Sequence, residues 1–233
     1  MIVNATPQLR HKVFAEFFAG IGLVRMGLEP GGWQCGYAND IEPKKFQMYA
    51  DMFDESDGYH VENIWNTRAV LDRWSTPAFL ATASFPCVDL SLAGHWKGFQ
   101  GEYSSTYFGF IEVLKSLDQD RPKVVMLENV VGFLNANDGK DFRQATTSLA
   151  KLGYQLDAII LDAKWFIPQS RPRLFVFGIH ESVAQNLCDT KLFEPDVADS
   201  WLMSEFSTSP LRPEKLIKAI NKANLIKTWN ILI

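Results

Sequence analysis

Short apolar runs that alternate with helix-like segments constrain the fold of this chain more than any other feature. Apolar runs predict strands over Lys12–Phe18, Gln34–Ala38, Pro77–Phe85, Lys123–Leu127, Gln155–Asp162 and Leu174–Ile179. Helical spacing and helix-start signals predict helices after Gly22 and over Pro43–Met52, Tyr107–Leu117 and Asp141–Leu152. Strands that alternate with helices build a mostly parallel sheet with helices on both faces. We therefore expect an α/β fold of the Rossmann-like type.

The alternation stops near Glu181. Leu202–Pro213 is rich in Ser and Pro, which indicates a linker, and Glu214–Thr228 has apolar residues on one side and lysines elsewhere. Such an amphipathic helix either packs on its own domain or docks on a partner, and the sequence leaves both open. We expect one domain over residues 1–180 and a linker with a helical tail over 181–233.

Composition bounds the class of protein. No window approaches the roughly 18 consecutive apolar residues of a membrane helix, and the N-terminus has no basic-then-apolar leader, so we expect a cytoplasmic protein that does not contact a membrane. The net charge is −4. A protein that grips nucleic acid alone usually shows a basic excess, although basic residues can still cluster on one face.

The cysteines predict neither a disulfide framework nor a metal site. Cys35, Cys87 and Cys188 are widely separated and form no Cys-x-x-Cys pair. Cys87 follows the end of a predicted strand, in Pro86-Cys87-Val88-Asp89-Leu90-Ser91, which is where open α/β sheets place their chemistry. A half-buried structural thiol is the alternative, because free cysteines commonly behave as small apolar residues.

A glycine turn and an acidic residue together indicate a nucleoside cofactor. Phe18-Ala19-Gly20-Ile21-Gly22 follows the first strand, and Asp40 ends the second, placed to accept hydrogen bonds from ribose hydroxyls. A full Gly-x-Gly-x-x-Gly is lacking, which argues against a loop that grips a pyrophosphate. S-adenosylmethionine has a ribose and no pyrophosphate and fits better, while a glycine turn without a ligand remains the alternative.

Two further features lie at predicted strand ends. Glu128-Asn129 ends a buried strand, so both side chains should emerge at the same sheet edge as Cys87. A protonated carboxyl group there can donate a proton to a ring nitrogen, although a solvated strand end is the ordinary interpretation. Arg171 and Arg173 alternate on the way into a strand and should share a face, either as functional donors or as a surface salt-bridging pair.

In combination these motifs resemble the DNA (cytosine-5) methyltransferases from about Val13 to Ile179. Phe18–Gly22 resembles the cofactor loop of that family, and Pro86–Ser91 its Pro-Cys-x-x-x-Ser nucleophile motif. Glu128-Asn129-Val130 resembles its Glu-Asn-Val, and Gln169-Ser170-Arg171-Pro172-Arg173 its Gln-x-Arg-x-Arg. The resemblance implies an S-adenosylmethionine-dependent methyltransferase fold, with the catalytic domain over residues 1–180.

The resemblance also implies a mechanism. Cys87 would add to C6 of cytosine, because C5 is otherwise too poor a nucleophile to take a methyl group. Glu128 would protonate or hydrogen-bond N3, while Arg173 and also Arg171 would hold O2 and orient Glu128. Because C6 is unreachable inside a duplex, double-stranded DNA would have to present a flipped-out base.

Cofactor contacts are implied in the same way. Asp40 would take the ribose hydroxyls, Phe18 and Ile41 would flank the adenine, Asn63 would lie near its amino group, and Pro86 would border the site. At Ile41 the family often has an aromatic residue.

One part of the family pattern is missing. Only residues 180–233 follow the last motif, too few for a target-recognition domain, and no Gly-Asn-Ser-like segment occurs. We therefore expect the catalytic subunit of a split enzyme that needs a second chain, or else a truncated remnant. A catalytically silent cofactor- or partner-binding protein, an RNA substrate and a cysteine hydrolase using Cys87 with His95 are the other interpretations.

Overall fold

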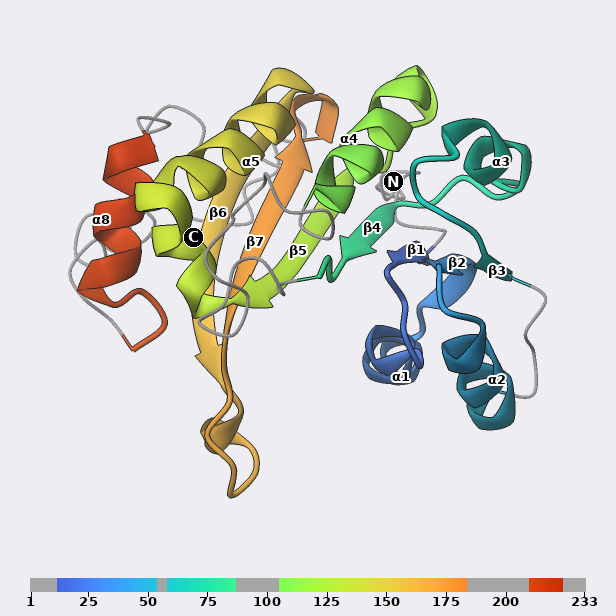
Figure 1. The fold of residues 1–233 in the computed structure, drawn as a ribbon, viewed down its shortest axis with the longest axis horizontal. Coiled ribbons are helices and arrows are strands. Elements are labelled where there is room, and N and C mark those ends of the chain that lie inside the picture. The colour runs from blue at the N-terminus through green and yellow to red at the C-terminus, as the bar shows by residue number, and fades with distance from the viewer. Residues whose placement is uncertain (1–11, 54–57, 87–104, 184–209, 224–233) are drawn as a thin grey trace, which may run out of the picture.

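The computed structural model describes residues 12–53, 58–86, 105–183 and 210–223. Within these ranges lies a seven-stranded sheet in the order β3-β2-β1-β4-β5-β7-β6 (Figure 1). The strands are β1 (Val13–Phe17), β2 (Gln34–Asp40), β3 (Tyr59–Val61), β4 (Leu80–Ala83), β5 (Val124–Val130), β6 (Tyr154–Asp162) and β7 (Pro172–His180). Strands β1 to β5 pair in parallel, whereas β7 runs antiparallel to both β5 and β6. This topology confirms the expected mostly parallel, Rossmann-like sheet.

Helices cover both faces of the sheet. They are α1 (Leu23–Leu28), α2 (Pro43–Met52), α3 (Thr67–Asp72), α4 (Thr106–Ser116), α5 (Lys140–Lys151) and α8 (Glu214–Ala223). Figure 1 shows α1 and α2 beside one face at the β1–β3 end, and α3, α4 and α5 along the opposite face. Helix α2 begins at Pro43 because a proline suits the first helical turn, and the Glu42 side chain accepts a hydrogen bond from the N–H of Lys44.

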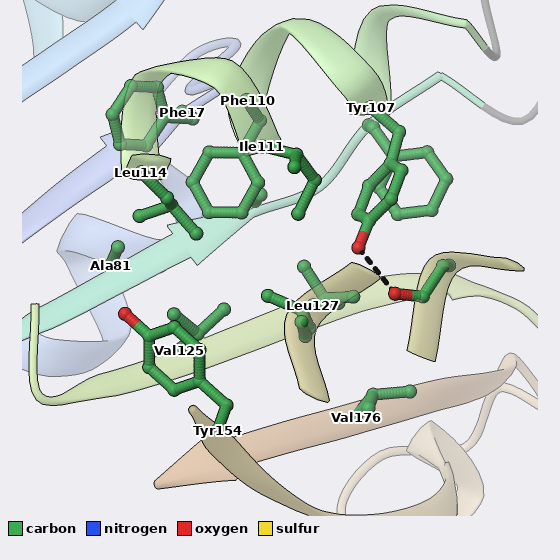
Figure 2. Packing of buried hydrophobic residues seen from close by; sticks show 14 of the residues in the cluster. Phe17, Ala81, Tyr107, Phe110, Ile111, Leu114, Val125, Leu127, Tyr154 and Val176 are labelled. Atoms are coloured by element: carbon green, nitrogen blue, oxygen red, sulfur yellow. Dashed lines mark hydrogen bonds between the residues drawn. The ribbon is translucent and has the colours of Figure 1, made fainter. Parts of the chain in front are cut away.

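The main core lies between the sheet and helices α4 and α5. Helix α4 places Tyr107, Phe110, Ile111 and Leu114 against Ala81, Val125 and Leu127 of the central strands, as Figure 2 shows. The Tyr107 hydroxyl donates to the carbonyl of Ala145 in α5, at 2.9 Å. The buried hydroxyl of Tyr107 therefore has a hydrogen-bond partner, and this bond connects helices α4 and α5.

Two of these strands and helices were not predicted from the sequence. Residues 54–60 were expected to form a loop and the stretch that follows was left unassigned, yet β3 pairs with β2, and α3 begins at the Asn66 cap. Both elements are short, with three and six residues, so neither shows a full period of apolar side chains.

The helical tail packs on the rest of the molecule. Leu216 and Ile220 of α8 are buried in the same core as α5. The segment just before α8 also contacts the sheet, because the N–H of Ile160 in β6 donates to the carbonyl of Leu211 at 2.8 Å, and Arg212 forms an ion pair with Asp157. The division of the chain at residue 180 stays a prediction.

Within the described ranges, no helix is long and apolar enough to cross a bilayer. Nor does any group of three His, Cys, Asp or Glu side chains in that part of the chain form a metal-binding cluster.

Candidate functional site

The β1–α1 turn is held by hydrogen bonds to residues of β2 and β3. The N–H of Gly20 donates to the Asp40 carboxylate at 3.0 Å, and the hydroxyl of Tyr59 donates to the Gly20 carbonyl at 3.1 Å. The N–H of Ala19 donates to the carbonyl of Asn39 at 2.8 Å. The turn that the sequence predicts as a cofactor loop is therefore fixed at the carboxyl edge of the sheet before any ligand arrives.

The turn needs glycine at one position and leaves space at another. Phe18, Gly20 and Gly22 all have positive φ angles, of 56°, 57° and 83°. A side chain at Gly22 would lie 2.4 Å from Phe53, so only glycine fits there. A Cβ at Gly20 would meet no atom of the described residues within 4 Å, so that part of the chain leaves space for a ligand beside Gly20.

Asp40 is buried, and its two carboxylate oxygens make four hydrogen bonds. They accept from the N–H of Gly20 and the N–H of Glu42, each at 3.0 Å, and both accept from Lys45 Nζ, at 3.0 and 3.1 Å. These four bonds use the acceptor capacity of a carboxylate. The Lys45 side chain is 46% exposed, so it is the partner that ribose hydroxyls could displace.

The other predicted cofactor residues lie near this edge. Ile41 is exposed directly after β2, and Ile21 is half-buried in the glycine turn. Asn63 is exposed two residues after β3, and its side-chain oxygen accepts from the N–H of Trp65, whose indole is also exposed. An open glycine turn, a buried carboxylate and exposed apolar side chains fit a nucleoside with a ribose. Sequence reasoning missed Trp65. Its position two residues after Asn63 was the only sign in the sequence that it could belong to the site.

The second half of the predicted site contains an ion pair. Arg173 Nε lies 3.0 Å from Glu128 Oε1, and both side chains are partly exposed. Strands β5 and β7 are antiparallel, with Val130 opposite Arg173 and Glu128 opposite Phe175, so the two charged side chains lie on the same face. The structure thus brings together residues that are 45 positions apart in the sequence.

The structure does not record the same contact for Arg171. Its backbone N–H donates to Asp162 Oδ1 at 2.7 Å, and its side chain is exposed beside the β6–β7 loop. Gln169 and Ser170 of the same motif lie in that loop, where the Ser170 hydroxyl donates to Asp162 Oδ2 at 3.0 Å. Of the two side chains that were expected to contact Glu128, only that of Arg173 does so in the structure.

Asn129 links the end of β5 to the segment that precedes Cys87. Its buried side-chain amide donates to the carbonyl of Phe85 at 3.1 Å, and its side-chain oxygen accepts from the N–H of Val130 at 2.8 Å. Pro86 follows Phe85 and is half-buried. Cys87 and His95 lie outside the described residues. Sequence reasoning gave Asn129 no separate role, although an amide at the end of a buried strand is a signal for one.

Glu16 is another residue that sequence reasoning missed. It lies in the fully buried strand β1, where its carboxylate accepts from the N–H of Val24 in α1 at 3.2 Å. Its other oxygen is buried and makes no hydrogen bond within the described part of the chain. Burial raises the pKa of Glu16 to about 7, against the opposing effect of the α1 N–H groups and of Arg25.

The sheet order with one antiparallel strand, and a glycine turn beside a buried acidic residue, define a Rossmann-like methyltransferase fold. Residues 13–228 match the C-5 cytosine-specific DNA methylase family, and the chain belongs to that family.

Individual relatives agree with the family match. The chain is 31% identical over 174 residues to the type II methyltransferase M.BsuFI of Bacillus subtilis. The aligned region covers 74% of this chain and 40% of the relative. It is 28% identical over 196 residues to M.HhaI of Haemophilus parahaemolyticus, with 83% and 57% covered. The chain therefore spans about half the length of these curated relatives.

Solved structures share the fold. The S. pombe Dnmt2 methyltransferase superposes with a TM-score of 0.57 at 22% identity, over 82% of this chain and 60% of that one. The Entamoeba histolytica methyltransferase EhMeth gives a TM-score of 0.59 at 20% identity, over 73% and 53%.

Proposed function

We propose that this chain forms the cofactor-binding and catalytic part of a DNA (cytosine-5) methyltransferase, acting on a cytosine flipped out of double-stranded DNA. The ion pair between Arg173 and Glu128 carries the proposal, because it lies at the same sheet edge as the glycine turn and Asp40. Family membership supplies the chemistry that such an edge would perform. The names of the bacterial relatives, type II methyltransferases, support a role in restriction and modification.

The reaction assigns one task to each residue. The thiolate of Cys87 forms a bond to C6 of the cytosine, and Glu128 donates a proton or hydrogen bond to N3, which takes up the electron density that the addition pushes into the ring. Arg173 holds O2 and keeps Glu128 in place through the 3.0 Å contact, with Arg171 as a second donor. After C5 is methylated, C5 loses its proton and the bond to Cys87 breaks, which restores the aromatic ring.

The cofactor would lie across the ends of the first three strands. S-adenosylmethionine supplies the methyl group when it is bound. Asp40 would accept from the ribose hydroxyls after Lys45 moves aside, and the open space beside Gly20 would admit the ligand close to the backbone. Phe18 and Ile41 would flank the adenine. The remaining assignments are Ala19, Ile21 and Gly22 in the turn, Asn63 near the adenine amino group, and Pro86 at the border.

We further propose that a second polypeptide supplies target recognition and the last family motif. The sheet face that carries Glu128 supports this, because Met126, Phe175 and Phe177 on it are only half-buried, while Leu127 and Val176 on the opposite face are buried. A half-exposed apolar face of this kind favours contact with another chain.

Covalent trapping tests the proposal. The full chain, with S-adenosylmethionine and a candidate second chain, is incubated with duplex DNA that contains 5-fluorocytosine, which cannot lose a proton from C5. We expect a DNA adduct that Cys87→Ser abolishes and that the matched variant Cys35→Ser keeps. Glu128→Gln should slow its formation on the order of a hundredfold.

Each other outcome changes a different part of the proposal. An adduct that persists in Cys87→Ser would refute Cys87 as the nucleophile. No adduct from a wild-type chain that binds the cofactor would contradict catalysis and favour a silent cofactor-binding protein. Robust sequence-specific methylation by the single chain would remove the second polypeptide and leave the chemistry in place. Preference for the same sequence as RNA would change the substrate alone.

A further inference from the structure

The loop between β6 and β7 presents three consecutive apolar side chains to solvent. Trp165, Phe166 and Ile167 are 59%, 73% and 51% exposed, and we call them the apolar tip. Figure 1 shows the β6–β7 hairpin (orange) extending well beyond the other strands of the sheet. Because large apolar side chains in water cost free energy, a contiguous group of them indicates a binding surface.

The loop that carries the apolar tip is ordered by hydrogen bonds within itself. The N–H groups of Phe166 and Ile167 both donate to the carbonyl of Ala163 at 2.9 Å. Asp162 joins the two ends of the loop, because it accepts from the N–H groups of Lys164 and Arg171. The tip is therefore held outward and ordered before binding, which lowers the entropy cost of an interaction.

The hairpin links the apolar tip to the proposed catalytic pair. Arg173, which contacts Glu128, lies opposite Leu161 at the base of the hairpin, and the tip begins four residues beyond Leu161. A base held by Glu128 and Arg173 would have left a duplex just outside this edge of the sheet. The tip would then lie at the level of that duplex.

The charges around the apolar tip are mostly positive. Lys164 and Arg171 flank it with exposed side chains, and Lys164 Nζ lies 6.0 Å from the ring centroid of Trp165. The nearby acid, Asp162, is within 3.7 Å of Lys164 and also accepts from the loop N–H groups. Aromatic rings beside cations suit stacked bases and phosphates, and apolar side chains are common wedges between base pairs.

We propose that the apolar tip contacts the DNA bases that flank the extruded cytosine and compensates for the stacking they lose. Its place relative to the target base rests on the function proposed above. Lys164 and Arg171 would contact the phosphates on either side of the tip.

Photocrosslinking tests the contact even where binding is weak. In the full chain, Phe166 is replaced by the photoreactive p-benzoylphenylalanine, and the same replacement of the exposed Met48 of α2 is the control. After irradiation with labelled duplex DNA, position 166 should crosslink to nucleotides within about two positions of the target cytosine. Position 48 should give no more than background.

An affinity measurement follows with natural side chains. Trp165→Ala with Phe166→Ala should weaken duplex binding on the order of tenfold, since one base stacked on an aromatic ring contributes about that much. Met48→Ala with Met52→Ala should leave the affinity for the duplex unchanged.

The crosslinking experiment can overturn the proposal in two ways. Crosslinks from position 166 would not exceed those from position 48, or they would go to the second polypeptide in place of DNA.

The two proposals fail separately. A 5-fluorocytosine adduct at Cys87 without a DNA crosslink from position 166 would refute the role of the apolar tip and leave catalysis standing. A crosslink without an adduct would refute catalysis and leave the DNA contact.

Discussion

The buried carboxyl group of Glu16 should make the stability of the protein depend on pH. Its pKa is raised from 4.5 to about 7 by desolvation, so the folded protein binds this proton more tightly than the unfolded chain. The contribution of Glu16 to the free energy of unfolding is largest below pH 4.5, where the group is protonated in both states. This contribution falls between pH 4.5 and 7 and changes little above pH 7. Across this window the free energy of unfolding should fall by at most about 1.4 kcal/mol for each pH unit.

Glu16→Gln should therefore flatten the pH dependence of the free energy of unfolding between pH 4.5 and 7, because the amide cannot ionise but can still accept from Val24. Urea unfolding across this pH range is the measurement. Glu112→Gln, at an exposed position, is the control, and an unchanged profile in Glu16→Gln would show that another group titrates.

The contacts of Asp40 predict opposite roles for two neighbouring charges in cofactor binding. Asp40→Asn should weaken binding of S-adenosylhomocysteine on the order of tenfold, because an amide presents one acceptor oxygen to the ribose hydroxyls. Lys45→Met should bind at least as tightly as the wild type, since its ammonium group occupies two acceptor positions of Asp40. Titration calorimetry measures both, and a tenfold loss in Lys45→Met would mean that the lysine itself holds the cofactor.

At the scale of secondary structure elements, Asn129 connects strands β4 and β5 beyond their last paired residues. Asn129→Ala would remove the two side-chain hydrogen bonds that Asn129 makes to the carbonyl of Phe85 and the N–H of Val130. We expect a loss of about 1–3 kcal/mol in the free energy of unfolding and slower trapping by Cys87. Asn135→Ala, at an exposed position, should change neither. Normal trapping in a destabilised Asn129→Ala protein would limit the residue to a structural role.

Prediction of elements from the sequence worked where a segment was long enough to show its period. Helix Pro43–Met52 was predicted with its observed ends because Pro43 marks its start and its apolar residues recur over ten positions. Strand β3 has three residues and is defined by its pairing with β2, and α3 has six. Pairing between segments that are distant in the sequence is not visible in either one.

At the scale of the whole molecule, α8 is integrated into the core, because Leu216 and Ile220 are buried against the elements that surround α5. Leu216→Ala should lower the free energy of unfolding by about 2–5 kcal/mol, the usual cost of truncating a buried leucine. Lys215→Ala, on the exposed side of the same helix, should have little effect. Thermal unfolding compares the two, and equal melting temperatures would show that α8 is held only loosely.

The sequence by itself determined the alternation of strands and helices, the approximate positions of most elements and the residue types at the carboxyl edge of the sheet. These are local properties, set by apolar periodicity, by glycine and proline, and by motif spacing. The tertiary structure alone decided which of these residues meet. The antiparallel register of β7 brings Arg173, and not the side chain of Arg171, to Glu128, and folding buries Glu16 and places Lys45 on Asp40. Such contacts depend on strand pairing and burial, which join positions far apart in the chain.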